Sequence, residues 1–303
     1  MTTPRSELLA AILADPDSRA ARQVYADLLQ QEGDPRGEFI ATQLARSALK
    51  TRAGVKALLA REDEILKKHK KKWVAFAAAT GARWEFRDGF AEKLSLDAAD
   101  LVRAGTAIFA TEPIVELSVW KIDALAPVLA LPGLARVRHL TLARSRLTAD
   151  DFAALASAPY LATVEVLDLS ESGLGDDGLA TLARSHAFPR LRDLRLRSCE
   201  LGPAGIAALV DARWAPGLAA LDLFINDIGD AGARAIATSE RLPKLASLVL
   251  THNKITDDAL AELLASPVVA RLEHLDLAGN LSESGILAMR ERLGKVIRWD
   301  GRG

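Results

Sequence analysis

The sequence has a single cysteine, Cys199, among its 303 residues. One cysteine excludes an internal disulfide and any metal cluster made of cysteines alone. Aromatic residues make up only 5% of the chain, and its formal net charge is −1. A near-neutral charge argues against nucleic acid as a partner, because proteins that bind the phosphate backbone usually carry a clear excess of basic residues.

Long apolar runs are also missing. No stretch approaches the roughly 18 consecutive apolar residues of a membrane-spanning helix. Residues 1–23 carry charges throughout their apolar stretch, unlike a secretory signal peptide. Hydrophobic residues nevertheless make up 50% of the chain and charged residues 26%, which is typical of a folded globular protein. These features predict a cytoplasmic protein that does not enter a membrane.

The sequence does contain a strict repeat. Two leucines separated by one residue recur every 27 residues, at Leu140/Leu142, Leu167/Leu169, Leu194/Leu196, Leu221/Leu223, Leu248/Leu250 and Leu275/Leu277. Three residues after the second leucine stands a small polar residue or cysteine, namely Ser145, Ser172, Cys199, Asn226, Asn253 and Asn280. An apolar residue follows two positions later, except in the last unit, where Leu281 comes one position early.

The residue pattern of each unit predicts a short strand, then a turn, then a helix. The alternation of the leucines sends them inward and the residue between them outward. The Ser/Cys/Asn column is expected to satisfy backbone groups where the chain leaves the strand. A turn rich in Gly, Asp and Thr is typical of a helix N-terminus, and an amphipathic helix follows. Such units must stack to bury their apolar faces, with strands inside the curve and helices outside.

The pattern LxxLxLxxN/C followed by a helix resembles the leucine-rich repeats of the ribonuclease-inhibitor and cysteine-containing classes. This resemblance implies an α/β solenoid shaped like a horseshoe over residues 81–303, with a hairpin and irregular repeats at 81–133, regular repeats at 134–290 and a C-terminal cap at 291–303. Looser units appear at Leu94–Leu96 and Leu117–Val119, and Val296–Trp299 is expected to form a final covering strand.

The pattern of apolar residues in the segment 1–80 predicts a small, all-helical domain. Apolar residues fall at helical spacing in four segments, 8–13, 24–29, 39–44 and 55–76, the last ending at Phe76. Gly33 suits the end of a helix, and Asp34-Pro35 suits the start of the next. After these helices, Asp88-Gly89 lies between Trp84–Phe86 and the apolar stretch from Phe90, which predicts a β-hairpin.

Part of this domain, about residues 7–44, resembles a bacterial repeat-companion domain. The motif residues are Asp15-Pro16, Tyr25-Ala26-Asp27 and Gly33-Asp34-Pro35-Arg36-Gly37-Glu38. Leu28 stands where that family usually has Trp, and Gln30 and Gln31 replace common acidic residues, which affects a partner surface more than the fold. The family has no established activity, so the resemblance implies a bacterial origin and no specific chemistry.

Residue types that often carry chemistry have simpler explanations here. Asp34 is expected to cap a helix while Arg36 pairs with a carboxylate, although a ligand-binding cluster with Asp27 and Glu38 is an alternative. The basic run Lys67–Lys72 predicts a solvated helix end, with contact to an anionic surface or RNA as the alternative. Cys199 occupies a column otherwise held by Ser and Asn. The glycine pairs recur with the 27-residue period and lack the pattern of a phosphate-binding loop; they are Gly175/Gly178, Gly202/Gly205 and Gly229/Gly232. Three histidines lack the spacing of metal ligands or of a catalytic group, namely His139, His252 and His274. We therefore predict no catalytic, cofactor or metal site.

The concave face is the most informative surface. Residues between and just after the paired leucines should point into the curve. Adjacent strands lie about 4.8 Å apart, which places four of these residues in one patch: Arg195, Arg197, Asp222 and Phe224. Asp168 lies one strand away, and Trp120 lies four strands from Phe224, roughly 19 Å distant. An exposed phenylalanine between arginines is typical of a protein-binding hot spot.

These observations favour a non-catalytic interaction scaffold that binds a bacterial protein partner. Two alternatives stay open: a small-GTPase regulator, by analogy with the Ran GTPase-activating protein, which has similar repeats, and a structural spacer. The analogy rests on fold alone. Sequence does not identify the partner, the pathway or the oligomeric state, nor whether the N-terminal domain or the concave face is the main binding surface.

Overall fold

The computed structural model describes residues 3–49, 51–74, 81–293 and 297–298. Its contacts divide the chain into two compact units, Met1–Leu117 and Ser118–Gly303. Phe76, placed above at the end of the fourth helical segment, lies outside the described residues. No helix of the described residues is long and apolar enough to cross a membrane.

Four helices begin the first unit: α1 (Pro4–Ala14), α2 (Arg19–Gln31), α3 (Pro35–Ala48) and α4 (Arg52–Trp73). The predicted junction between α2 and α3 is confirmed. Gly33 has a φ of +72°, and the Asp34 side chain accepts a hydrogen bond from the Arg36 amide, with Pro35 in the first turn. The helices bury a common core that includes Ile12, Leu29 and Ile40.

The predicted hairpin is also present. Strand β1 (Arg83–Arg87) pairs antiparallel with β2 (Phe90–Asp97) through a turn at Asp88-Gly89. Gly89 has a φ of +88°, and a Cβ atom there would lie 2.1 Å from Cγ1 of Ile40. Both the backbone and the space therefore require glycine. Helix α5 (Ala98–Thr111) follows, and then β3 (Glu116–Trp120).

Two buried ion pairs tie the helices of this unit to the segments that follow them. Arg36 donates to both oxygens of Glu112, at 2.8 and 2.7 Å, which confirms its predicted pairing with a carboxylate. Arg22 pairs with Glu92 at 2.5 Å. Both arginines also lie over the ring of Phe90. Buried charges of this kind must be paired, because an isolated ion in an apolar interior is very costly.

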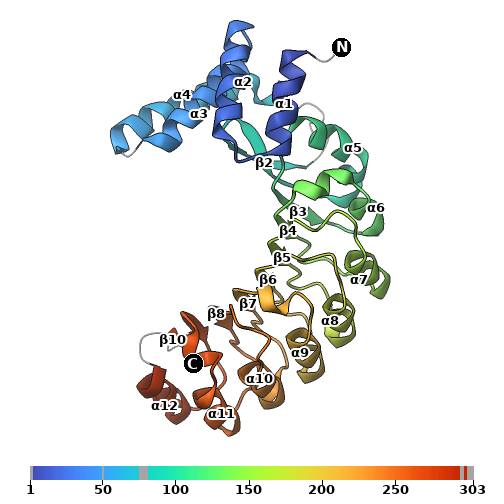
Figure 1. The fold of residues 1–303 in the computed structure, drawn as a ribbon, viewed down its shortest axis with the longest axis vertical. Coiled ribbons are helices and arrows are strands. Elements are labelled where there is room, and N and C mark those ends of the chain that lie inside the picture. The colour runs from blue at the N-terminus through green and yellow to red at the C-terminus, as the bar shows by residue number, and fades with distance from the viewer. Residues whose placement is uncertain (1–2, 50, 75–80, 294–296, 299–303) are drawn as a thin grey trace. The chain divides into compact units, whose positions relative to one another are not determined.

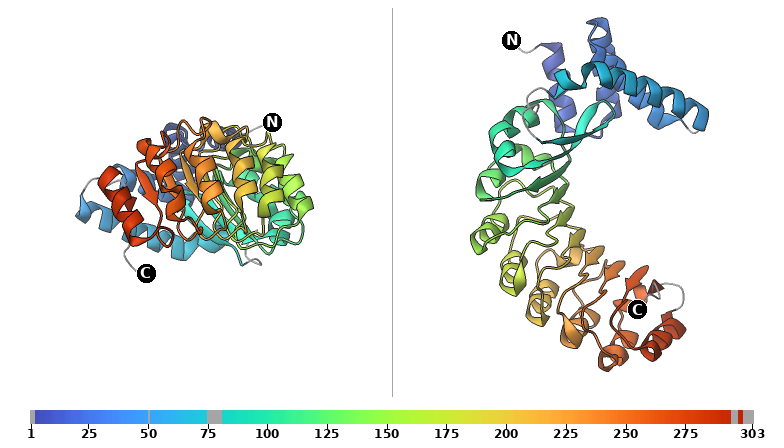
Figure 2. Two further views of the ribbon diagram at one scale, coloured as in Figure 1. Left: turned by 90° about the horizontal axis from the view of Figure 1, so that it is seen from below. Right: turned by 180° about the vertical axis from the view of Figure 1, so that it is seen from behind.

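The second unit repeats one strand and one helix (Figures 1 and 2). Its strands from β4 on are β4 (His139–Thr141), β5 (Val166–Asp168), β6 (Asp193–Arg195), β7 (Ala220–Asp222), β8 (Ser247–Val249), β9 (His274–Asp276) and β10 (Ile297–Arg298). Its helices are α6 (Ala126–Leu129), α7 (Ala149–Ala156), α8 (Gly175–Ala183), α9 (Pro203–Val210), α10 (Gly229–Ala237), α11 (Leu260–Ala265) and α12 (Glu283–Leu293). Within this unit the strands lie inside the curve and the helices outside it.

The register of the strands follows the repeat. Strands β4 to β9 pair in parallel, and each leucine faces the leucine 27 residues away, as Leu140 faces Leu167 and Leu194 faces Leu221. The paired leucines are buried throughout, which confirms the predicted α/β leucine-rich-repeat solenoid. Strand β10 pairs in parallel with β9, so the predicted covering strand exists at Ile297 and Arg298, while Val296 and Trp299 lie outside the described residues.

Five of the six residues in the polar column bond to the backbone, as predicted, and the buried Ser172 hydroxyl is the exception. Asn226 is buried, and its Nδ2 donates to the carbonyls of Leu196 and Leu223. Its Oδ1 accepts from the amides of Cys199 and Leu201, at 3.0 and 3.1 Å. The side chain therefore joins two successive repeats, and this acceptor role goes beyond the predicted one.

Aspartates in the first turns of α8 and α10 add a second link between repeats. Asp176 Oδ1 accepts from the Gly202 amide at 2.8 Å, and Asp230 Oδ1 accepts from the Thr256 amide at 2.7 Å. These carboxylates are not simple caps of their own helices, because each accepts a hydrogen bond from a backbone amide of the following repeat. The glycines nearby are packing and turn residues, since a Cβ at Gly205 would lie 2.4 Å from Asp176.

Candidate protein-binding face

Three aspartates on the concave face shape the exit from their strands. Oδ1 of Asp168, Asp222 and Asp276 accepts a hydrogen bond from the amide two residues further on, at 3.0 to 3.1 Å. A side chain that accepts from a nearby amide in this way gives that amide a partner where the chain leaves the strand. Two of the residues predicted for binding, Asp168 and Asp222, therefore also have a structural task.

Three of the predicted residues are in direct contact. Nε of Arg197 donates to Oδ2 of Asp222 at 2.5 Å. The same guanidinium lies over the ring of Phe224, 5.6 Å from its centroid. Phe224 in turn meets His252 edge to face, with centroids 6.1 Å apart. The turn after β6 thus supplies a cation that lies over an aromatic ring in the turn after β7, and such stacking is favourable for arginine.

Arg195 is the last residue of β6, two positions before Arg197, and it has a different partner. Its guanidinium donates to Asp193 on the same strand, with Nη2 2.8 Å from Oδ2. The hydrogen bond with Asp193 raises the pKa of Arg195, and the charges of Asp168 and Asp222 raise it further. The pairing with Asp193 was missed, because residues at this position vary and carry no repeat signal.

Trp120 is not part of this cluster. It is half-buried at the end of β3, and β4, β5 and β6 lie between its strand and β7. The sequence placed it elsewhere on the face, and it has no contact with Phe224 or the two arginines. The geometry therefore assigns the patch to Arg195, Arg197, Asp222 and Phe224, joined by His252.

Ile225 completes the patch and was also missed. It directly follows Phe224, its side chain is 45% exposed, and its φ is +52°. Positive φ recurs at this column in successive repeats, at Arg144, Glu171, Ser198, Ile225 and His252. A left-handed conformation costs an L-residue roughly 1–2 kcal/mol, and a β-branched residue there is a clear outlier. Residue type alone gives no sign of this column. Its only signal is the constant distance from the paired leucines.

We define the Phe224 patch as Arg195, Arg197, Asp222, Phe224, Ile225 and His252. Its centre is apolar, its margin is charged, and hydrogen-bonded strands support it. Such a surface fits contact with another protein. It offers neither a paired acid and base nor an activated nucleophile.

Residues with potential for chemistry lie elsewhere and are engaged otherwise. Cys199 is buried, its thiol donates to the Leu169 carbonyl at 3.1 Å, and burial raises its pKa to about 11. A thiol of this kind is unreactive at neutral pH, which confirms its structural role. Lys67 and Lys68 are exposed near the end of α4 and pair with Asp63 and Glu64. Among the described residues no three His, Cys, Asp or Glu side chains are arranged to hold a metal.

Comparison with known proteins identifies the repeats. The family model described as Leucine Rich repeat matches residues 160–183, 190–210, 218–237 and 241–264. The chain contains leucine-rich repeats. These four matched segments cover β5 to β8 and the helices α8 to α11, and so include the whole Phe224 patch. No curated protein matches the chain.

Solved structures with some similarity include an internalin from Listeria monocytogenes, at 18% identity and a TM-score of 0.44, over 75% of this chain and 64% of that one. TLR13, in a complex with ssRNA13, matches at 17% identity and a TM-score of 0.36, over 61% and 32%. Rad7, in the yeast complex with Elc1, matches at 12% identity and 0.33, over 96% and 91%. The match spans less than two thirds of the internalin and about a third of TLR13.

Proposed function

We propose that this chain is a non-catalytic scaffold that binds a protein partner through the concave face of its repeats, centred on the Phe224 patch. The observation that carries the proposal is an arginine held over a phenylalanine ring beside an exposed, left-handed isoleucine. Arginine and large aromatic residues are enriched among interface residues that dominate binding energy.

The contacts within the patch favour binding over stability. The Arg197–Asp222 pair is substantially exposed on the arginine side, and surface ion pairs of this kind contribute at most about 1 kcal/mol to stability. The pair does fix the guanidinium over Phe224 before any partner arrives. A side chain that is already ordered loses less conformational entropy on binding.

Ile225 supports the same interpretation. In the free chain its left-handed backbone costs conformational energy, and nearly half of its apolar side chain remains in water. A partner that covers Ile225 and Phe224 with an apolar side chain, and reaches Arg195 or Arg197 with a carboxylate, would match both the centre and the margin of the patch.

The test is affinity capture from extracts of the source organism with the wild-type chain and two variants. We expect Phe224→Ala and Arg197→Glu each to lower the affinity of a specific captured protein by about tenfold or more, because truncation of a hot-spot residue costs about 2 kcal/mol. Leu287→Ala and Arg146→Glu are matched controls at exposed positions outside the patch. Full retention of every captured protein by both patch variants would dismiss the proposal.

Ile225→Asn separates binding from stability. Asparagine accepts the left-handed region better than isoleucine, so we expect the free energy of unfolding to rise by about 0.5–1 kcal/mol while affinity for the captured partner falls. The control Arg144→Asn has the same backbone conformation in a repeat outside the patch and should change stability alone. Equal affinity for Ile225→Asn and the wild type would show that Ile225 has no part in binding.

Several finer assignments belong to this proposal. We propose that the repeats are of the ribonuclease-inhibitor or cysteine-containing class, that residues 7–44 form a repeat-companion domain within a helical region ending near residue 80, and that the protein acts in a bacterial cytoplasm. The polar column Ser145, Ser172, Cys199, Asn226, Asn253 and Asn280 supports the class. The Asp34-Pro35 helix start and the Arg36–Glu112 pair support the motif of the companion domain.

A further inference from the structure

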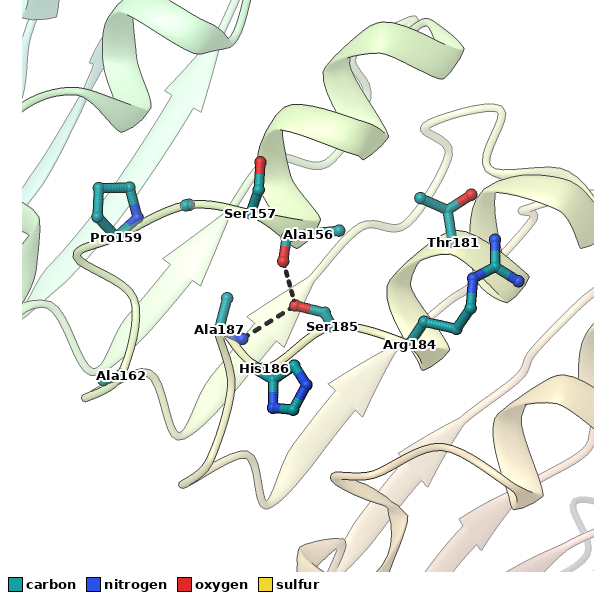
Figure 3. Close-up of a pocket in the computed structure, with 10 residues that line it drawn as sticks. Ala156, Ser157, Pro159, Ala162, Thr181, Arg184, Ser185, His186 and Ala187 are labelled. Atoms are coloured by element: carbon teal, nitrogen blue, oxygen red, sulfur yellow. Dashed lines mark hydrogen bonds between the residues drawn. The ribbon is translucent and has the colours of Figure 1, made fainter.

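A groove runs along one edge of the second unit, where each helix ends and the chain returns to the next strand. It consists of two adjoining hollows of about 460 and 590 Å³ that share Ser185 and His186. Figure 3 shows the first hollow. The lining comes from the four successive loops that follow α7, α8, α9 and α10. This edge is distinct from the concave face that carries the Phe224 patch.

The second hollow is basic. Arg213, Arg241 and Lys244 line it, and all three are exposed. None of the three forms an ion pair with a carboxylate in the described part of the chain, and the bond that Arg241 makes is to the Ala212 carbonyl at 3.3 Å. The loops after α8, α9 and α10, which line this hollow, also carry the exposed Arg184 and Arg190, and between their helices and the next strands they contain two acidic residues, Asp211 and Glu240.

The fold does not explain these cations. Basic residues stabilise the negative end of a helix, but this effect falls off within the last turn. Helix α9 ends at Val210 and α10 at Ala237, so Arg213, Arg241 and Lys244 lie beyond the last turn of their helices. In contrast, the acidic residues Asp176 and Asp230 at the opposite edge have backbone partners.

The first hollow is mainly apolar. Half of its lining residues are alanine or proline, including Ala158, Pro159 and Ala162, and among the described residues that line it Arg184 is the one lysine or arginine. The Ser185 hydroxyl in its lining is already used, because Ser185 Oγ donates to the Ala156 carbonyl at 2.5 Å and accepts from the Ala187 amide at 3.0 Å (Figure 3). The groove therefore changes along its length from a mainly apolar lining with one arginine to three cations that form no ion pair in the described part of the chain.

We propose that this groove binds an extended acidic segment of a partner polypeptide, with small apolar residues in the first hollow and Asp or Glu residues in the second. Successive repeats are about 5 Å apart at the strands and about 10 Å apart at the helices. Four loops therefore span roughly 15–30 Å, which five to nine residues of extended chain would cover at about 3.3 Å each.

Single-stranded nucleic acid fits the groove less well. Binding without sequence preference requires aromatic faces on which bases stack. The two large aromatic residues of the lining, Phe188 and Trp214, are buried, and the indole N–H of Trp214 donates to the Leu182 carbonyl at 2.9 Å. Among the described residues that line the two hollows, the imidazole of His186 is the one exposed aromatic ring. The groove thus offers several cations but a single small aromatic ring, which is too little for a run of stacked bases.

Fluorescence anisotropy with a dye-labelled peptide of alanines followed by glutamates tests the proposal. The variant Arg213→Glu/Arg241→Glu/Lys244→Glu reverses the basic hollow. The matched control Arg144→Glu/Arg146→Glu/Lys254→Glu makes the same change in net charge at the opposite edge, where Arg144 and Lys254 already have carboxylate partners. Circular dichroism verifies that both variants are folded, and a dye-labelled oligothymidylate serves as the nucleic-acid probe.

We expect the wild type to bind the peptide at low ionic strength, with an affinity that falls as salt is added. The groove variant should lose about tenfold or more in affinity, because complementary charge becomes like charge, and the control should stay close to the wild type. Absence of peptide binding at low salt, equal loss in both variants, or tighter binding of oligothymidylate that disappears with the groove variant would each overturn the proposal.

Discussion

We expect Glu112→Ala to lower the free energy of unfolding of the first unit by about 3–5 kcal/mol, because it leaves a buried cation without its partner. The Glu112 side chain is 1% exposed. Its oxygens accept two bonds from Arg36 and one from the Ala91 amide. Burial raises the pKa of Glu112, while Arg36 and the Ala91 amide act in the opposite direction. Urea denaturation followed by circular dichroism and tryptophan fluorescence measures the change.

Two further variants separate loss of a charge from loss of the pair. Glu32→Ala removes one partner of an exposed ion pair with Arg5 and should have little effect. The double variant Arg36→Met/Glu112→Leu replaces both buried charges by apolar groups and should recover much of the lost stability. If Glu112→Ala is as stable as the wild type, the pair does not hold the helices to the segment after α5.

Asn226→Ala is expected to destabilise the repeats by about 3 kcal/mol or more, because buried backbone groups without partners cost about 1–3 kcal/mol each. The change removes the side-chain partner of two amides and two carbonyls in adjoining repeats. Differential scanning calorimetry of the full chain, with urea denaturation to supply the free energy, measures the effect.

Asn280→Ala provides the matched control for Asn226. The same substitution in the same column removes equivalent bonds to Asn253, Leu250 and Leu277. Asn280 is only half-buried, so water can replace its bonds in part. We therefore expect a clearly smaller loss of stability. Equal losses for the two variants would indicate that the column acts through local turn geometry and not through buried bonds between repeats.

The regular part of the fold was predictable because one physical requirement repeats in every unit. A leucine must face the leucine of the next strand, so the 27-residue period determined the strands, their parallel direction and their register. Asp34-Pro35 and Asp88-Gly89 were predictable for a different reason, since each fixes a local backbone conformation on its own. In all these cases the deciding contacts lie close in sequence or recur at a constant interval.

Other features could not be predicted because their partners follow no period. Glu112 lies 76 residues after Arg36, and nothing near either residue indicates the pair. At the candidate site, too, the features that follow the repeat were predictable and the individual side-chain contacts were not. The columns of the repeat placed Arg195, Arg197, Asp222 and Phe224 together, but whether Arg197 pairs with Asp193 or with Asp222 depends on side-chain conformation. The left-handed backbone at Ile225 depends on the turn that all repeats share, and its residue type gives no hint of it.

The most direct measurement is site-specific photo-cross-linking to the captured partner. A photoreactive phenylalanine derivative replaces either Val249, which faces Asp222 from the next strand of the concave face, or Ala207, which is exposed on α9. A partner that lies on the Phe224 patch would cross-link from position 249 and not from position 207. Cross-links from 207 alone would place the partner on the helical side and contradict binding through the concave face.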